Sequence, residues 1–306
     1  MSENAAPQKN SRFLGMLALV SAVVFFSTIE IVSKDVASKG AQIEPFLMVF
    51  LRFFVTGVVL LTIALPGYFR KGGKLSWQDW KIFLLNGFFG IAVSISLFHA
   101  AIIMFNNASS SAVVFSANAV FAIVIARFMN NEAWSTRKWA AVIFALLGIS
   151  LFIFEKGKPN LDTLNAILTM SLAALGFAYS VCLTRQRVHK YGATMFMGAS
   201  ALVGSLFTLP LALWRLPADY LGEIAKVWPE LTYIVLVGTT LAYFFYYFGL
   251  KHISAFIASM TFFLKPGLAC ILAWLWSGEQ MNAWTITGTL IILCALSLTL
   301  KRRRVA

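Results

Sequence analysis

The chain has 306 residues, of which 59% are hydrophobic and 12% are charged, with a formal net charge of +13 at pH 7. A soluble domain carries about 25% charged residues. The composition therefore excludes an ordinary soluble protein and indicates that lipid is the solvent. The three cysteines, Cys182, Cys270 and Cys294, lie in apolar stretches and form no disulfide framework or CxxC metal motif.

A polar segment, residues 1–11, opens the chain, and we expect it to be a disordered tail. The apolar stretch from Arg12 is too long for a signal-peptide core and lacks a clear small-residue cleavage site, so we interpret it as a retained span. About 20 apolar residues cross the hydrocarbon core of a bilayer. Stretches of this length predict ten transmembrane helices, over residues 13–34, 45–66, 80–100, 108–129, 137–154, 163–184, 194–214, 230–250, 254–276 and 282–300.

The lysines and arginines between these spans are distributed unevenly. With the N-terminus inside, 17 of the 25 basic residues lie on the inner side and 6 on the outer side, while Arg52 and Lys265 lie within spans. This bias is typical of short cytoplasmic loops. We therefore expect a multi-pass protein of the cytoplasmic membrane with both termini in the cytoplasm, including a basic tail over residues 302–306. Because the basic residues determine topology, nucleic acid is excluded as a partner.

One apolar pattern occurs twice in the chain. Residues 109–132 and 256–279 are both of membrane length, both end on a glutamate, and lie 147 residues apart. Other spans support the duplication, since Gly90 aligns with Gly238. Each half, 12–155 and 156–301, carries five spans, and an odd number forces the second half to enter the membrane from the opposite side. The sequence thus predicts an all-α membrane protein built from two inverted five-helix repeats, an architecture typical of transporters with a binding site near the membrane midplane.

Several segments resemble those of a known family. They are FLRFF around Arg52, the run FYYFGLKHISAFIAS, the Lys265-Pro266 position, and the span endings ALLGISLFIF and LIILCALSLTL. By these features the chain is similar to the drug/metabolite transporter superfamily, specifically the EamA-type ten-helix members. The resemblance implies a central cavity lined by the first, third, fourth, sixth, eighth and ninth spans, and transport of amino acids, other small metabolites or drugs. The first repeat departs from this pattern, with Ala119 at the position of Pro266.

Lys265 is the sharpest candidate for a substrate-binding residue. It lies near the middle of the ninth span, and a charge at that depth is expensive and marks functional sites. Pro266 follows it, and a proline inside a helix frees a carbonyl and bends the chain. The ammonium could bind a substrate carboxylate or phosphate, or it could pair with Glu30 or a freed carbonyl. Asn118 is the equivalent residue of the first repeat, and it could bond to substrate or to a neighbouring helix.

Three more polar residues lie in the outer parts of spans. Glu30 could accept a substrate amine or titrate as a coupling carboxylate, or it could pair with Lys34 or Arg52. We interpret Arg52 as structural. His99 could form a proton-sensitive gate or lie at the membrane interface. If Glu30 and Lys265 both face the cavity, the pair would suit a zwitterion such as an amino acid.

Aromatic residues line one face of the eighth span. Tyr243, Tyr246 and Tyr247 have i, i+3 and i+4 spacing, and Tyr179 lies in the sixth span. They could form an aromatic cavity wall, or they could pack between helices. Glu132 and Glu279 end the two copies of the repeated pattern. We expect both to accept hydrogen bonds from loop amides or from the start of the next helix, where carboxylates are favoured.

The chain contains no Walker A loop, HExxH or GxSxG motif and no paired acidic metal site. We therefore expect neither an enzyme nor a primary pump, and no cofactor or metal. The predicted function is secondary active transport of amino acids or related small metabolites by alternating access, as an exporter. The alternatives are efflux of drugs or lipophilic cations, a facilitative channel, and a non-transporting scaffold. Expected partners are a zwitterionic or anionic solute, membrane lipids and a coupling proton; a monomer is compatible with the sequence, which leaves the oligomeric state open.

Overall fold

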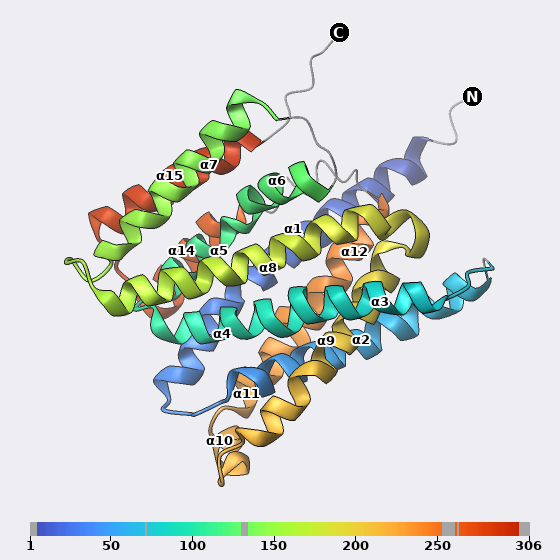
Figure 1. Cartoon of the computed structure of the whole chain (residues 1–306), viewed down its shortest axis with the longest axis horizontal. Helices are drawn as coiled ribbons and strands as arrows, with labels where there is room; N and C mark the ends of the chain where they lie inside the picture. Colours follow the sequence, from blue (N-terminus) through green and yellow to red (C-terminus); the bar gives the residue numbers. More distant parts are fainter. Residues whose placement is uncertain (1–4, 71, 130–133, 253–260, 262, 300–306) are drawn as a thin grey trace.

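The computed structural model describes residues 5–70, 72–129, 134–252, 261 and 263–299, and all secondary structure in these ranges is helical (Figure 1). Lipid contains no partner for an unpaired backbone amide or carbonyl, so a chain of this composition satisfies them within helices. The first half contains α1 (Ala5–Ser38), α2 (Pro45–Arg70), α3 (Trp77–Asn86), η1 (Gly87–Val93), α4 (Ser94–Met104), α5 (Ala108–Ser116), α6 (Asn118–Met129), α7 (Thr136–Leu151) and η2 (Phe152–Phe154). The second contains α8 (Leu161–Tyr191), α9 (Ala193–Trp214), α10 (Tyr220–Lys226), α11 (Trp228–Thr232), η3 (Tyr233–Leu241), α12 (Ala242–His252), α14 (Lys265–Ser277) and α15 (Ala283–Thr299).

Eight helices in the described part of the chain are long and apolar enough to cross a membrane, and they coincide with the first eight predicted spans. The tenth predicted span corresponds to the shorter helix α15, with 17 residues. Part of the ninth lies outside the described residues, as does the basic tail 302–306. The helix α1 begins at Ala5, inside the segment expected to be a disordered tail, so it continues beyond the predicted first span. Large exposed apolar side chains, such as Phe128 and Trp214, fit a surface that faces lipid.

The helices of the two halves pack against each other reciprocally. The first span contacts the eighth through α1 and α12, and the third contacts the sixth through α4 and α8. The second and seventh spans pair through α2 and α9, the fourth and ninth through α5 and α14, and the fifth and tenth through α7 and α15. In Figure 1, α1 and α8 run in opposite directions. Inverted halves require this pattern of exchange, because each contact then has a counterpart in the other half.

Departures from the regular α-helix occur at equivalent places in the two halves. The π-helical segments η1 and η3 contain Gly90 and Gly238, which the sequence aligns. Ala117 separates α5 from α6, and Leu264 precedes α14; these residues lie 147 positions apart, the spacing of the sequence repeat. Segments of π-helix are frequently found at functional sites. The deviations thus recur in the two halves at about the spacing of the sequence repeat.

Small residues allow the closest helix contacts. A Cβ atom added at Gly57 of α2 would lie 2.6 Å from the backbone nitrogen of Leu202 in α9. The α7–α15 contact is similar, since a Cβ at Gly148 would lie 2.6 Å from Cγ1 of Ile292. Membrane helices associate through such close packing, because lipid removes the hydrophobic driving force between them.

The α2–α9 contact can be tested with two substitutions in one helix. Gly57→Ala should destabilise the protein by about 1–3 kcal/mol, because the added methyl group meets backbone atoms that cannot move aside. The control is Gly67→Ala, where an added Cβ meets no atom within 4 Å and alanine improves helix propensity by up to about 1 kcal/mol. Thermal unfolding of the purified protein in detergent should show a lower midpoint for the first variant only. Equal midpoints would mean that the two helices do not approach this closely.

Candidate functional site

Lys265 and Glu30 form an ion pair inside the helix bundle. The Lys265 Nζ atom lies 2.8 Å from Oε1 of Glu30, and the two side chains are 12% and 0% exposed. The sequence left several partners open for Lys265 and for Glu30, and in the structure the two residues pair with each other. It contains neither a Glu30–Lys34 nor a Glu30–Arg52 pair within the residues that it describes.

Three elements position this pair. Lys265 is the first residue of α14, where Pro266 occupies a position that suits the start of a helix. Glu30 comes from α1, and Ser27 of the same helix lies 3.5 Å from the carbonyl oxygen of Lys265. Below the ammonium is the ring of Phe115 in α5, with its centroid 5.4 Å from Nζ. The interruption before α14 thus places a cation where α1, α5 and α14 meet.

One carboxylate oxygen of the pair has no partner. Oε2 of Glu30 is buried and accepts no hydrogen bond from any residue in the described ranges. Nearly all buried polar atoms in proteins are hydrogen-bonded, and an orphaned one is costly. Glu30 can therefore accept a further donor without losing Lys265.

Asn118 stands at the equivalent position of the first half, 147 residues before Lys265. It is half-buried, and its Nδ2 atom donates a hydrogen bond of 2.7 Å to the carbonyl of Phe115. The side chain thereby satisfies a carbonyl at the break between α5 and α6. The break in the first half therefore forms without a proline, since Ala119 stands where the second half has Pro266.

The tyrosines divide into two groups. Tyr243 and Tyr247 of α12 are buried and stacked, with ring centroids 6.1 Å apart, and Tyr243 also meets Phe26 of α1 at 4.9 Å. Tyr246 contacts Tyr247 at 5.2 Å. Phe26 precedes Glu30 by one helical turn, so the two side chains share a face of α1. The tyrosines of α12 pack against this face through Phe26.

Tyr179 belongs elsewhere. Its ring contacts Phe89 at 5.7 Å, and it packs against the cluster that contains Phe83 and Tyr191. The structure therefore does not bring Tyr179 together with the tyrosines of α12.

Arg52 and His99 form a second polar group. Arg52 is 3% exposed and donates a hydrogen bond of 2.8 Å to the Thr239 hydroxyl and another to Nε2 of His99. His99 is 4% exposed, so the surrounding helices cover its imidazole. Thr56 and Thr240 extend the group by a hydrogen bond of 2.9 Å. Sequence reasoning missed the threonines of η3, because no pattern indicates which face a π-helical segment turns toward α2.

Two carboxylates hold the start of α5. Glu279 accepts hydrogen bonds from the backbone amides of Ala108 and Ser109, at 2.6 and 3.1 Å, and from the Ser109 hydroxyl at 2.8 Å. Glu155 accepts from the amides of Asn106 and Asn107 at 3.1 and 2.9 Å. Glu279 therefore bonds to a helix start, but to that of α5 in the other half and not to that of the helix that follows it in the chain. Glu132 lies outside the described residues.

The sequence profile of the EamA-like transporter family matches residues 13–154 and again residues 164–301. Each match falls within one of the two predicted halves.

Known proteins resemble the chain over most of its length. It is 28% identical over 285 residues to an uncharacterized transporter of Clostridium kluyveri, covering 91% of this chain and 90% of that protein. It is 26% identical over 273 residues to the S-adenosylmethionine uptake transporter of Rickettsia prowazekii, covering 85% of each. Protein PecM of Dickeya dadantii is 27% identical over 258 residues, covering 83% of this chain and 82% of that protein.

One solved crystal structure has the same fold. It superposes with a TM-score of 0.66 at 16% identity, over 96% of this chain and 100% of that chain. The family profile, the named transporters among the relatives and the apolar helices lead to one conclusion. The chain belongs to the EamA-like transporter family and is a multi-pass membrane transporter.

Proposed function

We propose that the protein is a secondary transporter of zwitterionic amino acids or related small metabolites, and that Lys265 and Glu30 bind them. The observation that carries the proposal is the buried pair with an unpartnered carboxylate oxygen. A zwitterion offers a carboxylate to Lys265 and an ammonium to Glu30. It can therefore separate the two side chains while leaving each of them with an opposite charge.

The cost of separating buried charges favours this class of solute. Removing one partner of a buried ion pair costs about 3–5 kcal/mol, because the other charge stays unpaired. A lipophilic cation would pair with Glu30 and leave Lys265 unpaired and repelled. The buried pair thus favours zwitterions over the drug-efflux alternative.

The surroundings of the pair fit a solute with an apolar part. Phe26 lies one turn from Glu30 along α1, and Tyr243 of α12 packs on it with Tyr247 stacked behind, so the three rings supply an aromatic surface. The relative from Rickettsia prowazekii is named for S-adenosylmethionine, which is itself an amino acid with a bulky side chain. Its name specifies uptake, whereas we predict export for this chain, so direction is a separate measurement.

The reciprocal helix packing supports alternating access. Each contact between halves has a counterpart, so rocking one half against the other can exchange which side of the site is open. The pair lies beside the helix interruptions, where the backbone tolerates such movement. We further propose that Glu30 carries the coupling proton.

The binding role of the pair can be separated from its structural role. Lys265→Ala should abolish counterflow of a labelled amino acid in proteoliposomes, and it should also lower the unfolding temperature, because Glu30 is left buried and unpaired. The double variant Lys265→Met/Glu30→Gln should recover stability without recovering transport, since neither charge remains. Lys39→Ala is the control, because its ion pair with Glu230 is exposed. Normal counterflow by either variant of Lys265 would refute the binding role.

Substrate class can be tested by competition. Unlabelled amino acids and S-adenosylmethionine should inhibit counterflow in the wild-type protein, because both supply an ammonium and a carboxylate. Amino acid amides and lipophilic cations should inhibit at least about tenfold less, the factor that corresponds to a loss of 1.4 kcal/mol. Stronger inhibition by lipophilic cations would favour the drug-efflux alternative. Loading the labelled solute inside or outside the vesicles gives the direction of net flux.

Proton coupling predicts a distinct defect for Glu30→Gln. A glutamine cannot release a proton, so an imposed pH gradient should no longer drive accumulation, while counterflow without a gradient should persist in part. The measurement compares both modes in the same vesicles. Accumulation that still follows the pH gradient would assign the proton to another residue.

A further inference from the structure

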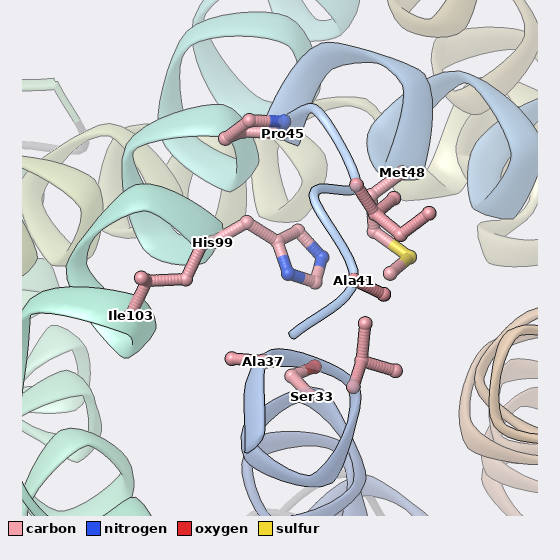
Figure 2. A pocket seen from close by; sticks show the side chains of 9 residues that line it. Ser33, Ala37, Ala41, Pro45, Met48, His99 and Ile103 are labelled. Carbon is pink, nitrogen blue, oxygen red and sulfur yellow. The ribbon is translucent and has the colours of Figure 1, made fainter. Parts of the chain in front are cut away.

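A small pocket lies at the predicted outer end of the bundle, about one turn beyond Glu30 along α1 (Figure 2). Its volume is about 30 Å³, close to the share of liquid volume taken by one water molecule. Its wall is formed by α1, the loop after α1, the start of α2, and α4. Figure 2 shows the imidazole of His99 pointing toward the space between these elements, with Ser33 on the facing helix.

The Ser33 hydroxyl is one of two hydrogen-bond donors in this wall. It is buried and has no partner among the described residues. Other hydroxyls of α1 bond back to their own helix, such as those of Ser27 to the Val23 carbonyl and Ser38 to the Asp35 carbonyl. Helical serines ordinarily do the same. Ser33 is therefore a donor that the fold itself leaves without an acceptor.

The second donor is His99. A guanidinium has no acceptor, so Arg52 must donate to Nε2 of His99. Nε2 is then unprotonated, and the neutral imidazole carries its proton on Nδ1. The hydrogen bond to Arg52 thus fixes a tautomer whose remaining N–H is available on the pocket side of the ring.

A positive charge stands behind these donors. Arg52 has no carboxylate within ion-pair distance in the described ranges; its partners are the Thr239 hydroxyl, His99 and the face of Phe53. Glu30 is the acidic group whose charge acts on Arg52, and it is paired with Lys265 through one of its two oxygens. The other acidic groups near the pocket also have partners. Asp35 accepts from the Trp276 indole, and Glu44 lies 3.6 Å from Arg215. Lys34, next to Ser33, adds a further positive charge, and its ammonium donates to the Phe105 carbonyl.

Two unpartnered donors lie in front of a guanidinium that has no directly bonded carboxylate in the described ranges, an arrangement that attracts a monoanion. We propose that this pocket, with Ser33 and His99 in its wall and Arg52 behind His99, is a carboxylate-binding site distinct from the Lys265–Glu30 pair. Its volume is too small for a whole metabolite and leaves room for the oxygen-bearing end of a carboxylate. A larger depression of about 350 Å³ lies next to it, sharing Ile43 and Pro45 as lining residues. A solute whose carboxylate enters the small pocket has room there for the rest of the molecule; this assignment of the solute rests on the proposed function.

Acetate tests the site without knowledge of the substrate. The full-length protein in detergent should be stabilised against heat by acetate, at ionic strength held constant with sodium sulfate, and not by the neutral isostere acetamide. Ser33→Ala should raise the acetate concentration for a half-maximal shift about tenfold, because a hydrogen bond to a charged group is lost. The matched control is Ser96→Ala, whose hydroxyl is also buried and unpartnered but lies outside the pocket. Identical shifts in the two variants and the wild type would overturn the proposal.

A second variant and a second ligand pair complete the test. Ala37→Leu fills the pocket from α1 and should remove the acetate effect that Ser33→Ala only weakens. Glycine should compete with acetate, whereas glycinamide, which lacks the carboxylate, should not. Acetate binding without glycine competition would identify a site for free small anions, and absence of both would refute a site of either kind. The acetate shift should persist in Lys265→Met/Glu30→Gln, so failure here and failure of the proposed function are distinguishable.

Discussion

Every backbone amide and carbonyl of a chain in lipid must find its partner within the protein. This constraint makes all secondary structure in the described ranges helical, and it restricts where a helix can be interrupted. The interruptions before Asn118 and Lys265 lie inside the bundle, where other residues can satisfy or surround the freed groups. Asn118 bonds to the Phe115 carbonyl, and the Ser27 hydroxyl approaches the carbonyl of Lys265. The same breaks that the protein must satisfy internally also place polar side chains inside the bundle, at the depth where the sequence predicts the membrane midplane.

A buried ion pair contributes little net stability, since desolvation offsets most of the attraction between its charges. It contributes specificity instead, because any arrangement that leaves one of the charges buried and unpaired is costly. In the proposed function, this property of Lys265 and Glu30 constrains both the resting protein and the solute that enters. The aromatic residues beside the pair add apolar contact but no further charge. In the proposed function, discrimination between solutes by their charge therefore rests on Lys265 and Glu30.

Much of the fold could be predicted from apolar length and repetition. Eight spans coincide with described helices, and the spacing of 147 residues recurs in the helix interruptions. The sequence also identified Lys265 as an intramembrane charge, but it left the partner of Glu30 open. Depth along a span is readable from sequence, whereas rotation about the helix axis is set by packing. For the same reason Tyr179 could not be separated from Tyr243, and the neighbours of Arg52 on η3 were missed.

The two glutamates at the start of α5 bear on which way the site opens. Glu279 reaches α5 from the other half of the molecule, with three hydrogen bonds, and Glu155 binds the preceding loop with two more. Hydrogen bonds to a charged group contribute about 1.5–3 kcal/mol each. Separating α5 from α14 at this end therefore requires breaking the three hydrogen bonds of Glu279 together. Glu279 thus ties α5 to α14 at the predicted outer end in this conformation, so opening between these two helices must break its hydrogen bonds as a set.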